Sequence, residues 1–367
     1  MSRSARRWIV NLLRVAVSVV AVVAVVRMIR WQDYWVIQDA GEQPRYYELP
    51  RIRQVVPATD LVRVVWADGH ESSHRSAHRG DGFLTLFDHT SKPLFAAMMA
   101  AMMIPYFLMS LRWWMLLRGH GFQPRLGQIF FITYAGTFFN NFLPGSVGGD
   151  LTKAILAASG EERKAAVAGT VILDRVIGLA VMIVLGATCL TPFVGRFADR
   201  RLAGLIYGLL GALMLGYLLY MSPPVRRLVE RLPFKKTIAE LDGVFRTASD
   251  KKALVAKAAG LSFAAQAAGI LVIYGFAKAL GVAGAALWMF FIFEPIIFIV
   301  TALPISVGGW GVQEKIYLTL FTNFGGIDPN QAIALSVLYK LSLILVSIPG
   351  GMLFAIGATR RSPPGPS

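Results

Sequence analysis

The sequence predicts an all-α polytopic membrane protein that carries a small β-rich insert. Three observations support this fold class. Apolar residues make up 55% of the 367 residues and charged residues only 16%, whereas soluble domains carry about 25% charge. Six apolar runs are each long enough to supply the roughly 20 residues that a helix needs to cross a bilayer. Two further apolar runs are interrupted in the middle by proline and paired glycine.

The six uninterrupted runs are predicted to be full spans. The first, residues 12–31, follows a basic segment and has no small-residue cleavage site after its apolar core. We therefore expect a retained N-terminal anchor helix, residues 1–30, and not a cleaved signal peptide. The other five spans are predicted at residues 94–117, 165–191, 202–221, 253–280 and 331–357.

Residues 31–92 differ from the rest of the chain because they hold nine acidic residues and short β-like runs. The runs RYYEL, IRQVV, LVRVVW and GFLTLF are separated by turn residues, which predicts a small β-rich insert. Four of the five histidines lie here, at His70, His74, His78 and His89. A helix would align the first three for a metal ion. The segment HESSHRSAHRGDG is polar, however, so we expect a solvated loop and no metal site.

The distribution of charge predicts the orientation in the membrane. The net charge is +16, and basic residues gather at the N-terminus, in 112–125, in the 222–257 loop and in the tail 359–367. With six spans and two re-entrant hairpins these segments share one side, which the positive-inside rule makes cytoplasmic. We therefore expect a multi-pass protein of the bacterial inner membrane with cytoplasmic termini and an extracytoplasmic insert. The basic loop should contact anionic lipid at the cytoplasmic face, and not nucleic acid.

The two interrupted runs contain the same break. LPGSVGGD (143–150) and LPISVGGWG (303–311) align at an offset of 160, and the spans before them align at the same offset. VILDRVIGL aligns with SVLYKLSLI at an offset of 165, which matches Arg175 with Lys340. The membrane domain, 93–358, is therefore predicted to be an inverted repeat in which each half is a span, a broken re-entrant hairpin and a span. Repeat 1 covers 94–191, the connector helix 202–221 and repeat 2 253–357.

The two breaks form the predicted substrate site. Proline removes a backbone donor and glycine tolerates positive φ, so LPxSVGG should unwind a helix inside the membrane. The half-helices that start near Asp150 and Trp310 are expected to aim free N–H groups at an anion such as a phosphate. Arg175 and Lys340 would add cationic donors. The candidate substrate-binding residues are Asn140, Asn141, Pro144, Ser146, Gly148, Gly149, Asp150, Lys153, Asp174, Arg175, Glu294, Pro304, Ser306, Gly308, Gly309, Trp310, Gln313, Glu314 and Lys340.

These residues also have a purely structural interpretation. Glycine and proline in membrane helices can mark only a kink or close packing. Arg175 can be the ion-pair partner of Asp150, Asp174 or Glu294, and Lys340 can snorkel to the head groups. The same alternative holds for Lys153, Glu314 and Lys315 as interfacial charges, and for Asn140 and Asn141 as hydrogen bonders at a hairpin tip.

The segments LPGSVGGDLTKA, VILDRVIGL and LPISVGGWGVQE resemble the flippase-like family that includes the membrane region of lysylphosphatidylglycerol synthases. The resemblance covers about residues 94–357 and implies a helical domain with re-entrant segments that moves lipids between leaflets. In the synthases a cytoplasmic aminoacyltransferase domain attaches lysine to phosphatidylglycerol. Only RRSPPGPS follows the last predicted span, so we expect no such domain. The resemblance does not explain the insert.

The leading hypothesis is a lipid flippase, and not an enzyme, that holds the head group of a phospholipid or polyprenyl-phosphate lipid between the two breaks. One alternative is a membrane enzyme that transfers a group to a lipid phosphate, with Asp150, Asp174 or Glu294 as the base. Another is a structural partner of an envelope synthase. The sequence shows no nucleotide-binding motif and predicts no cofactor, so ion coupling or a lipid gradient would drive transport. The lipid, the direction of movement and the oligomeric state stay open.

Overall fold

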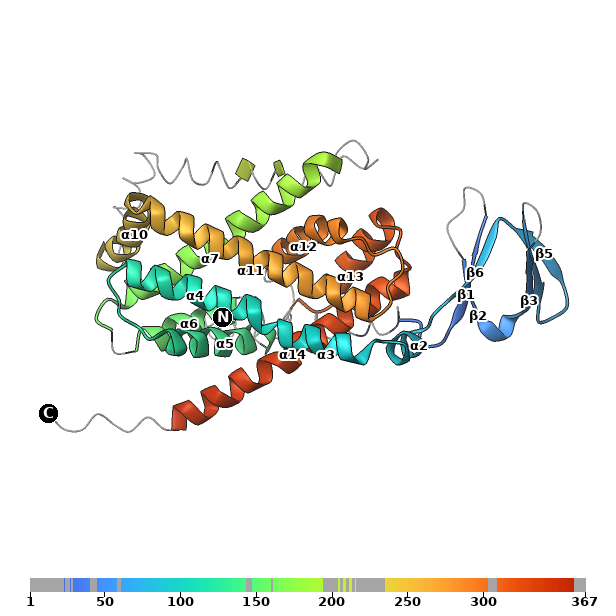
Figure 1. Ribbon diagram of the computed structural model, residues 1–367, viewed down its shortest axis with the longest axis horizontal. Coiled ribbons are helices and arrows are strands. Elements are labelled where there is room, and N and C mark those ends of the chain that lie inside the picture. Colours follow the sequence, from blue (N-terminus) through green and yellow to red (C-terminus); the bar gives the residue numbers. More distant parts are fainter. Residues whose placement is uncertain are drawn as a thin grey trace, which may run out of the picture.

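The computed structural model describes residues 29–39, 45–57, 61–142, 147–159, 161–193, 235–302 and 309–359, together with Val23, Arg27 and six residues between 204 and 215. The long helices lie side by side in an elongated bundle (Figure 1). The β-strands of the insert extend from one end of this bundle, and helix α10 (Lys235–Asp250) lies at the opposite end.

Four helices are long and apolar enough to cross a membrane. The first span, Lys92–Gly119, consists of α3 (Lys92–Ala101) and α4 (Met103–Gly119). The other three are α7 (Lys164–Leu190), α11 (Lys252–Ala279) and α14 (Pro329–Thr359). Large apolar side chains such as Phe107, Val184 and Leu345 are exposed on these helices, as expected for surfaces that face lipid. Four of the six predicted spans are thereby confirmed as helices that are long and apolar enough to cross a membrane.

The other two predicted spans lie almost entirely outside the described residues. Of residues 12–31, Val23 and Arg27 are helical and Ile29 to Trp31 are not. Of residues 202–221, the six that are described, from Gly204 to Leu215, are all helical. A total of six spans therefore stays a prediction.

Two pairs of shorter helices lie between the spans. The first pair is α5 (Leu126–Phe142) and α6 (Val147–Ala157). The second is α12 (Leu287–Ala302) and α13 (Val312–Tyr317), which continues as a π-helical segment, Leu318–Phe324. At 1.5 Å per residue, α5 and α12 are each only about 25 Å long and α6 is shorter still. The two pairs lie toward opposite ends of the bundle (Figure 1).

Each short-helix pair packs in its own hydrophobic cluster. The cluster around α5 contains Trp113, Ile129, Val167 and Val244, all buried. The cluster around α12 contains Phe276, Phe293, Phe321 and Leu335, also buried. The bundle is therefore stabilised by one apolar core near each end.

Helix α10 corrects part of the prediction that residues 222–257 are a basic loop. Its apolar residues Leu241, Val244 and Ala248 recur every three or four positions, which gives the helix one apolar face. Val244 and Ala248 are buried, and a Cβ on Gly169 of α7 would lie 3.1 Å from the Val244 side chain. Burial of this face against α7 stabilises a helix where the charge pattern alone indicated a loop.

The insert contains two antiparallel sheets of three strands. One has the order β2 (Arg45–Glu48), β1 (Tyr34–Gln38), β6 (Ser76–Gly80), and the other β3 (Ile52–Pro57), β4 (Val62–Trp66), β5 (Glu71–His74). Ile37, Ile52 and Val64 form its buried core. The β-runs predicted in RYYEL, IRQVV and LVRVVW are confirmed.

Two local predictions in the insert are wrong. The run GFLTLF forms helix α2 (Phe83–Asp88) and not a strand, because Phe83 packs on the buried Ile29 and Ile333 at the bundle. The polar segment HESSHRSAHRGDG is not a loop, since β5 pairs with β4 and β6 pairs with β1. Sheet pairing there satisfies the backbone while side chains such as Glu71 and Arg79 stay in solvent.

Two histidines of this segment lie beside carboxylates. The Nδ1 of His74 lies 2.9 Å from Asp39, and the Nδ1 of His70 lies 2.5 Å from Asp68. The hydrogen bond with His74 lowers the pKa of the Asp39 carboxyl group.

The insert is bound to the first turn of α14. Tyr34 donates a hydrogen bond to Asp328 at 2.6 Å, and burial, together with the Asp328 charge, raises the pKa of this phenol. The Asn330 side chain accepts from the backbone N–H of Arg30 at 3.0 Å. It also donates to the carbonyls of Arg30 and Asp81, at 3.2 and 3.0 Å. The insert and the start of α14 therefore lie at the same end of the bundle.

Candidate functional site

The first short-helix pair is held together by backbone contact at the paired glycines. The N–H of Gly149 donates to the Asn140 side chain at 2.7 Å. A Cβ on Gly149 would lie 2.1 Å from the carbonyl oxygen of Gly136, so no larger residue fits without movement of α6. The carbonyl of Gly148 accepts from Thr152 at 2.9 Å.

The second pair begins its return helix through two glycines with positive φ. Gly309 and Gly311 have φ values of 79° and 78° on either side of Trp310, a conformation that other residues rarely adopt. The N–H of Gly311 donates to Oε2 of Glu314 at 2.6 Å. Glu314 is 1% exposed, and its other oxygen, Oε1, has no hydrogen-bond partner among the described residues.

One backbone N–H group at each break is already bonded within the protein, and the prediction that the breaks present free N–H groups to an anion stays a prediction for the others. The Gly149 and Gly311 N–H groups already donate to Asn140 and Glu314. The residues of the break centres, Pro144, Ser146, Pro304, Ser306 and Gly308, lie outside the described residues.

Lys340 lies beside the second break. Its side chain is buried, and its Nζ donates to the Gln313 side chain at 3.4 Å. The Nζ lies 6.0 Å from the Trp310 ring centroid, and a Cβ built on Gly309 would be 3.5 Å away from it. Gln313 also donates to Ser336 at 3.4 Å. Lys340 therefore points toward the break and does not snorkel.

Asp174 and Arg175 have separate partners, as expected for adjacent residues of a helix. Arg175 pairs with Asp150 of α6, and the two side chains are 31% and 21% exposed. Asp174 accepts from Arg112 at 2.6 Å, and these side chains are only 4% and 8% exposed, for arginine and aspartate respectively. The second nitrogen of Arg112 donates to Ser262 at 2.6 Å. This buried network joins α4, α7 and α11.

Two further candidate residues are buried, one in each of the two short-helix pairs. Lys153 of α6 is 6% exposed, with its Nζ 5.8 Å from the Trp113 ring centroid. Glu294 of α12 accepts a hydrogen bond from Tyr317, and both are buried. Of the alternatives left open by the sequence, the structure contains Asp150 as the partner of Arg175 and hydrogen bonds of Asn140 and Asn141.

Helix α14 contacts both breaks. Asn141, at the end of α5, donates to Ser347 at 3.0 Å and to the carbonyl of Leu343 at 3.4 Å. Lys340 of the same helix contacts Gln313 beside the second break. Lys340 and Ser347 are seven residues apart, or about 10 Å along a helix. The ends of two hairpins from different halves of the chain therefore meet one short stretch of α14.

The sequence analysis missed Arg112, Ser262 and Tyr317. Arg112 was assigned to the basic flank of a span, yet it lies inside predicted span 94–117 and was as costly to bury as Asp174. The position of Arg112 inside an apolar run was the signal that could have identified it. Ser262 and Tyr317 carry no charge, and nothing in the sequence distinguishes them from other polar residues of the spans.

The fold and this buried polar interior define a multi-pass helical membrane protein. Residues 79–350 match the family described as the lysylphosphatidylglycerol synthase TM region. The match covers most of the chain, and the protein belongs to this family. A comparison with curated proteins finds no match.

Proposed function

We propose that the protein is a lipid transporter that moves a phosphate-bearing lipid between the leaflets of the bacterial inner membrane. The observation that carries the proposal is the meeting of both hairpins on α14, where Lys340 and Asn141 lie beside the two breaks. A head group held there would contact both halves of the membrane domain at once. Membership of a family named for a lipid-modifying synthase supports a lipid as the substrate.

Matching helix lengths support an inverted repeat. The spans Lys92–Gly119 and Lys252–Ala279 both have 28 residues, and both their ends are 160 positions apart. Helices α5 and α12 end 160 positions apart, at Phe142 and Ala302. Because one pair of short helices lies toward each end of the bundle, we infer re-entrant hairpins that enter from opposite sides, as in transporters that alternate access.

Buried cations support a phosphate as the recognised group. Lys153 of α6 and Lys340 of α14 are 6% and 5% exposed. Burial of a lysine is costly, and an anionic substrate would offset that cost. Arg175 would exchange part of its contact with Asp150 for the phosphate, which its forked guanidinium can bind bidentately.

The enzyme alternative has weaker support. Each of the three acids considered as a base already has a partner: Asp150 pairs with Arg175, Asp174 with Arg112, and Glu294 with Tyr317. A general base must instead reach a substrate proton. We therefore retain transport as the single proposed function.

The proposed orientation predicts which residues can be labelled from outside. In a Cys189→Ser background, single cysteines at Ser73 and Asn323 should react with a membrane-impermeant maleimide on intact cells. A cysteine at Ser249 should react only after permeabilisation. All three positions are exposed, and none of their side chains binds the insert to α14. Labelling of the Ser249 cysteine from outside would overturn the assigned entry sides of the hairpins.

The transport proposal predicts a loss of lipid movement when the interior cations are neutralised. In proteoliposomes, NBD-labelled phospholipids and a labelled polyprenyl phosphate should become accessible to dithionite with their masses unchanged. Lys340→Met should lower the rate of the transported lipid at least tenfold, and Lys153→Met and Arg175→Gln should lower it several-fold. The matched control is Lys278→Met, because Lys278 is an exposed cation at the end of a span.

Two results would reject the proposal. One is a change in lipid mass, which would identify an enzyme. The other is an undiminished rate of lipid movement in a well-folded Lys340→Met protein, which would show that the interior cations do not bind the substrate.

A further inference from the structure

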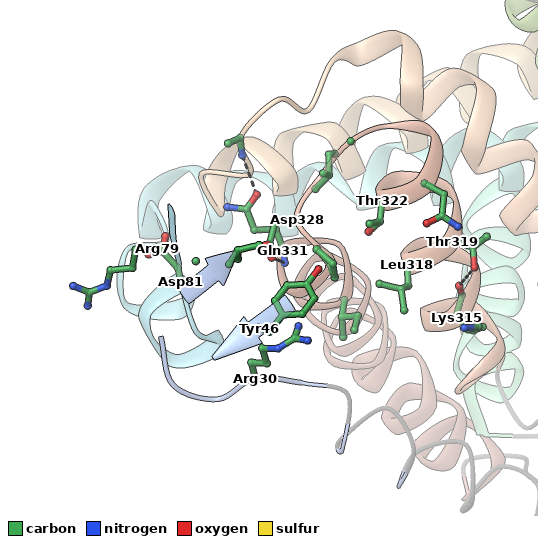
Figure 2. Close-up of a pocket in the computed structure, with 18 of the residues that line it drawn as sticks. Arg30, Tyr46, Arg79, Asp81, Lys315, Leu318, Thr319, Thr322, Asp328 and Gln331 are labelled. Atoms are coloured by element: carbon green, nitrogen blue, oxygen red, sulfur yellow. Dashed lines mark hydrogen bonds between the residues drawn. The ribbon is translucent and has the colours of Figure 1, made fainter. Parts of the chain in front are cut away.

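A pocket of about 1080 Å³ lies between the insert and the second half of the membrane domain. One wall comes from the insert and includes Val36, Tyr46 and Gly80. The opposite wall comes from α13, the π-helical segment and the start of α14, and it includes Leu318, Thr322 and Gln331 (Figure 2). The pocket is separate from the interior site. Of the residues that flank the two breaks, only Lys315 lines the pocket.

The charged side chains that line the pocket are mainly cationic. Arg27, Arg30, Arg79 and Lys315 line the pocket, together with the acids Asp81 and Asp328. Arg79 pairs with Asp33 at 2.5 Å, and its side chain extends away from the other labelled residues (Figure 2). Asp328 accepts from Tyr34 and from the N–H of Asn330, at 2.6 and 2.8 Å.

Arg30 is positioned to present its guanidinium to the pocket. The guanidinium carbon lies 3.7 Å from the ring centroid of Tyr46 and 5.0 Å from that of Tyr34. It makes no ion pair with any described residue. Stacking on aromatic rings fixes an arginine fork without using its hydrogen-bond donors, which then remain available for a phosphate or carboxylate.

The opposite wall offers a second charge. Lys315 is exposed and lies across the pocket from Arg30 (Figure 2). The buried hydroxyl of Thr322 has no hydrogen-bond partner within the described part of the chain. It belongs to the π-helical segment, and such segments occur frequently at functional sites. Thr322 lines this wall of the pocket, but its hydroxyl is covered by the protein, so the charge of Lys315 is the group that this wall offers to a ligand.

We propose that this pocket binds a phosphate-bearing polar group on the insert side of the membrane, with Arg30 and Lys315 holding the phosphate from opposite walls. The pocket borders Pro329, the first residue of a span, so it lies at the depth of lipid head groups. The ligand is therefore either a lipid head group or a water-soluble phosphate ester. This site does not depend on the proposed transport.

The test uses the full-length protein in an uncharged detergent. Glycerol 3-phosphate binding is measured by calorimetry, with glycerol as the uncharged comparison. Phosphatidylglycerol retention is measured by native mass spectrometry, with diacylglycerol as the lipid that lacks the phosphate. Arg30→Gln and Lys315→Gln are each compared with Arg51→Gln, which removes an exposed cation of the insert outside the pocket.

Each outcome decides the proposal. Glycerol 3-phosphate binding that falls at least tenfold in Arg30→Gln and in Lys315→Gln, but not in Arg51→Gln, supports a soluble ester. Phosphatidylglycerol retention with the same dependence, but without binding of the soluble probe, supports a lipid head group. Lys315→Gln also serves if Arg30→Gln loosens the insert, because Lys315 belongs to α13 and not to the insert. If neither probe distinguishes these variants from Arg51→Gln, the pocket is not a phosphate site.

Discussion

Arg112→Met should destabilise the protein more than any other single charge removal among the described residues. The arginine and its partner Asp174 are 4% and 8% exposed, and Asp174 would be left charged and buried. Removal of one partner of a buried ion pair costs about 3–5 kcal/mol. We therefore expect a large fall in the thermal unfolding midpoint, measured in detergent by intrinsic fluorescence, and poor expression.

The double variant Arg112→Met, Asp174→Leu tests the cause of that loss. It removes both charges, so most of the lost stability should return, since apolar replacements of a buried pair are often tolerated. The matched control is Arg246→Gln in the exposed pair with Asp242, which should change the unfolding free energy by less than about 1 kcal/mol. Equal effects of Arg112→Met and Arg246→Gln would contradict a structural role for the buried pair.

Gly149→Ala should disrupt the first hairpin. The added methyl group would lie 2.1 Å from the carbonyl oxygen of Gly136 and 2.6 Å from the Asn140 side chain. Because the nearest atom belongs to the backbone, α6 must move away from α5. Overpacking of this kind costs about 1–3 kcal/mol, occasionally more. We expect a lower unfolding midpoint together with loss of lipid movement in proteoliposomes.

Gly127→Ala provides the comparison within the same hairpin. A Cβ at Gly127 of α5 meets no atom within 4 Å, so this change should leave stability and transport unaltered or slightly improve stability through helix propensity. A Gly149→Ala protein with the stability and transport of Gly127→Ala would show that the close approach of α5 and α6 is unimportant.

The spans were predictable because a long run of apolar residues, which is a local property of the sequence, is enough to identify each one. The predicted run 94–117 differs from the observed span Lys92–Gly119 by only two residues at each end. The polar segments were less predictable, since their structure depends on partners distant in the chain. HESSHRSAHRGDG forms strands because β1 and β4 are present to pair with it, and the apolar face of α10 is explained by its burial against α7.

The residues of the candidate site also differ in how well the sequence predicts them. A charge inside an apolar run is visible in the sequence, so Asp174, Arg175, Glu294 and Lys340 were identified. The partners of Asp174 and Glu294 were not identified, because Arg112 lies 62 positions from Asp174 and Tyr317 lies 23 positions from Glu294. The local hydrogen bonds of Gly149 and Gly311 also escaped prediction, since they depend on the side-chain orientations of Asn140 and Glu314.

The attachment of the insert has an evolutionary consequence. Three hydrogen bonds link Asn330 to backbone atoms at Arg30, the residue before the insert, and at Asp81 within it. No substitution except proline at position 30 can remove those backbone groups. Of the described hydrogen bonds to Asp328 and Asn330, only that of Tyr34 uses a side chain of the insert, so other residues on the surface of the insert can diverge in sequence while these bonds are kept.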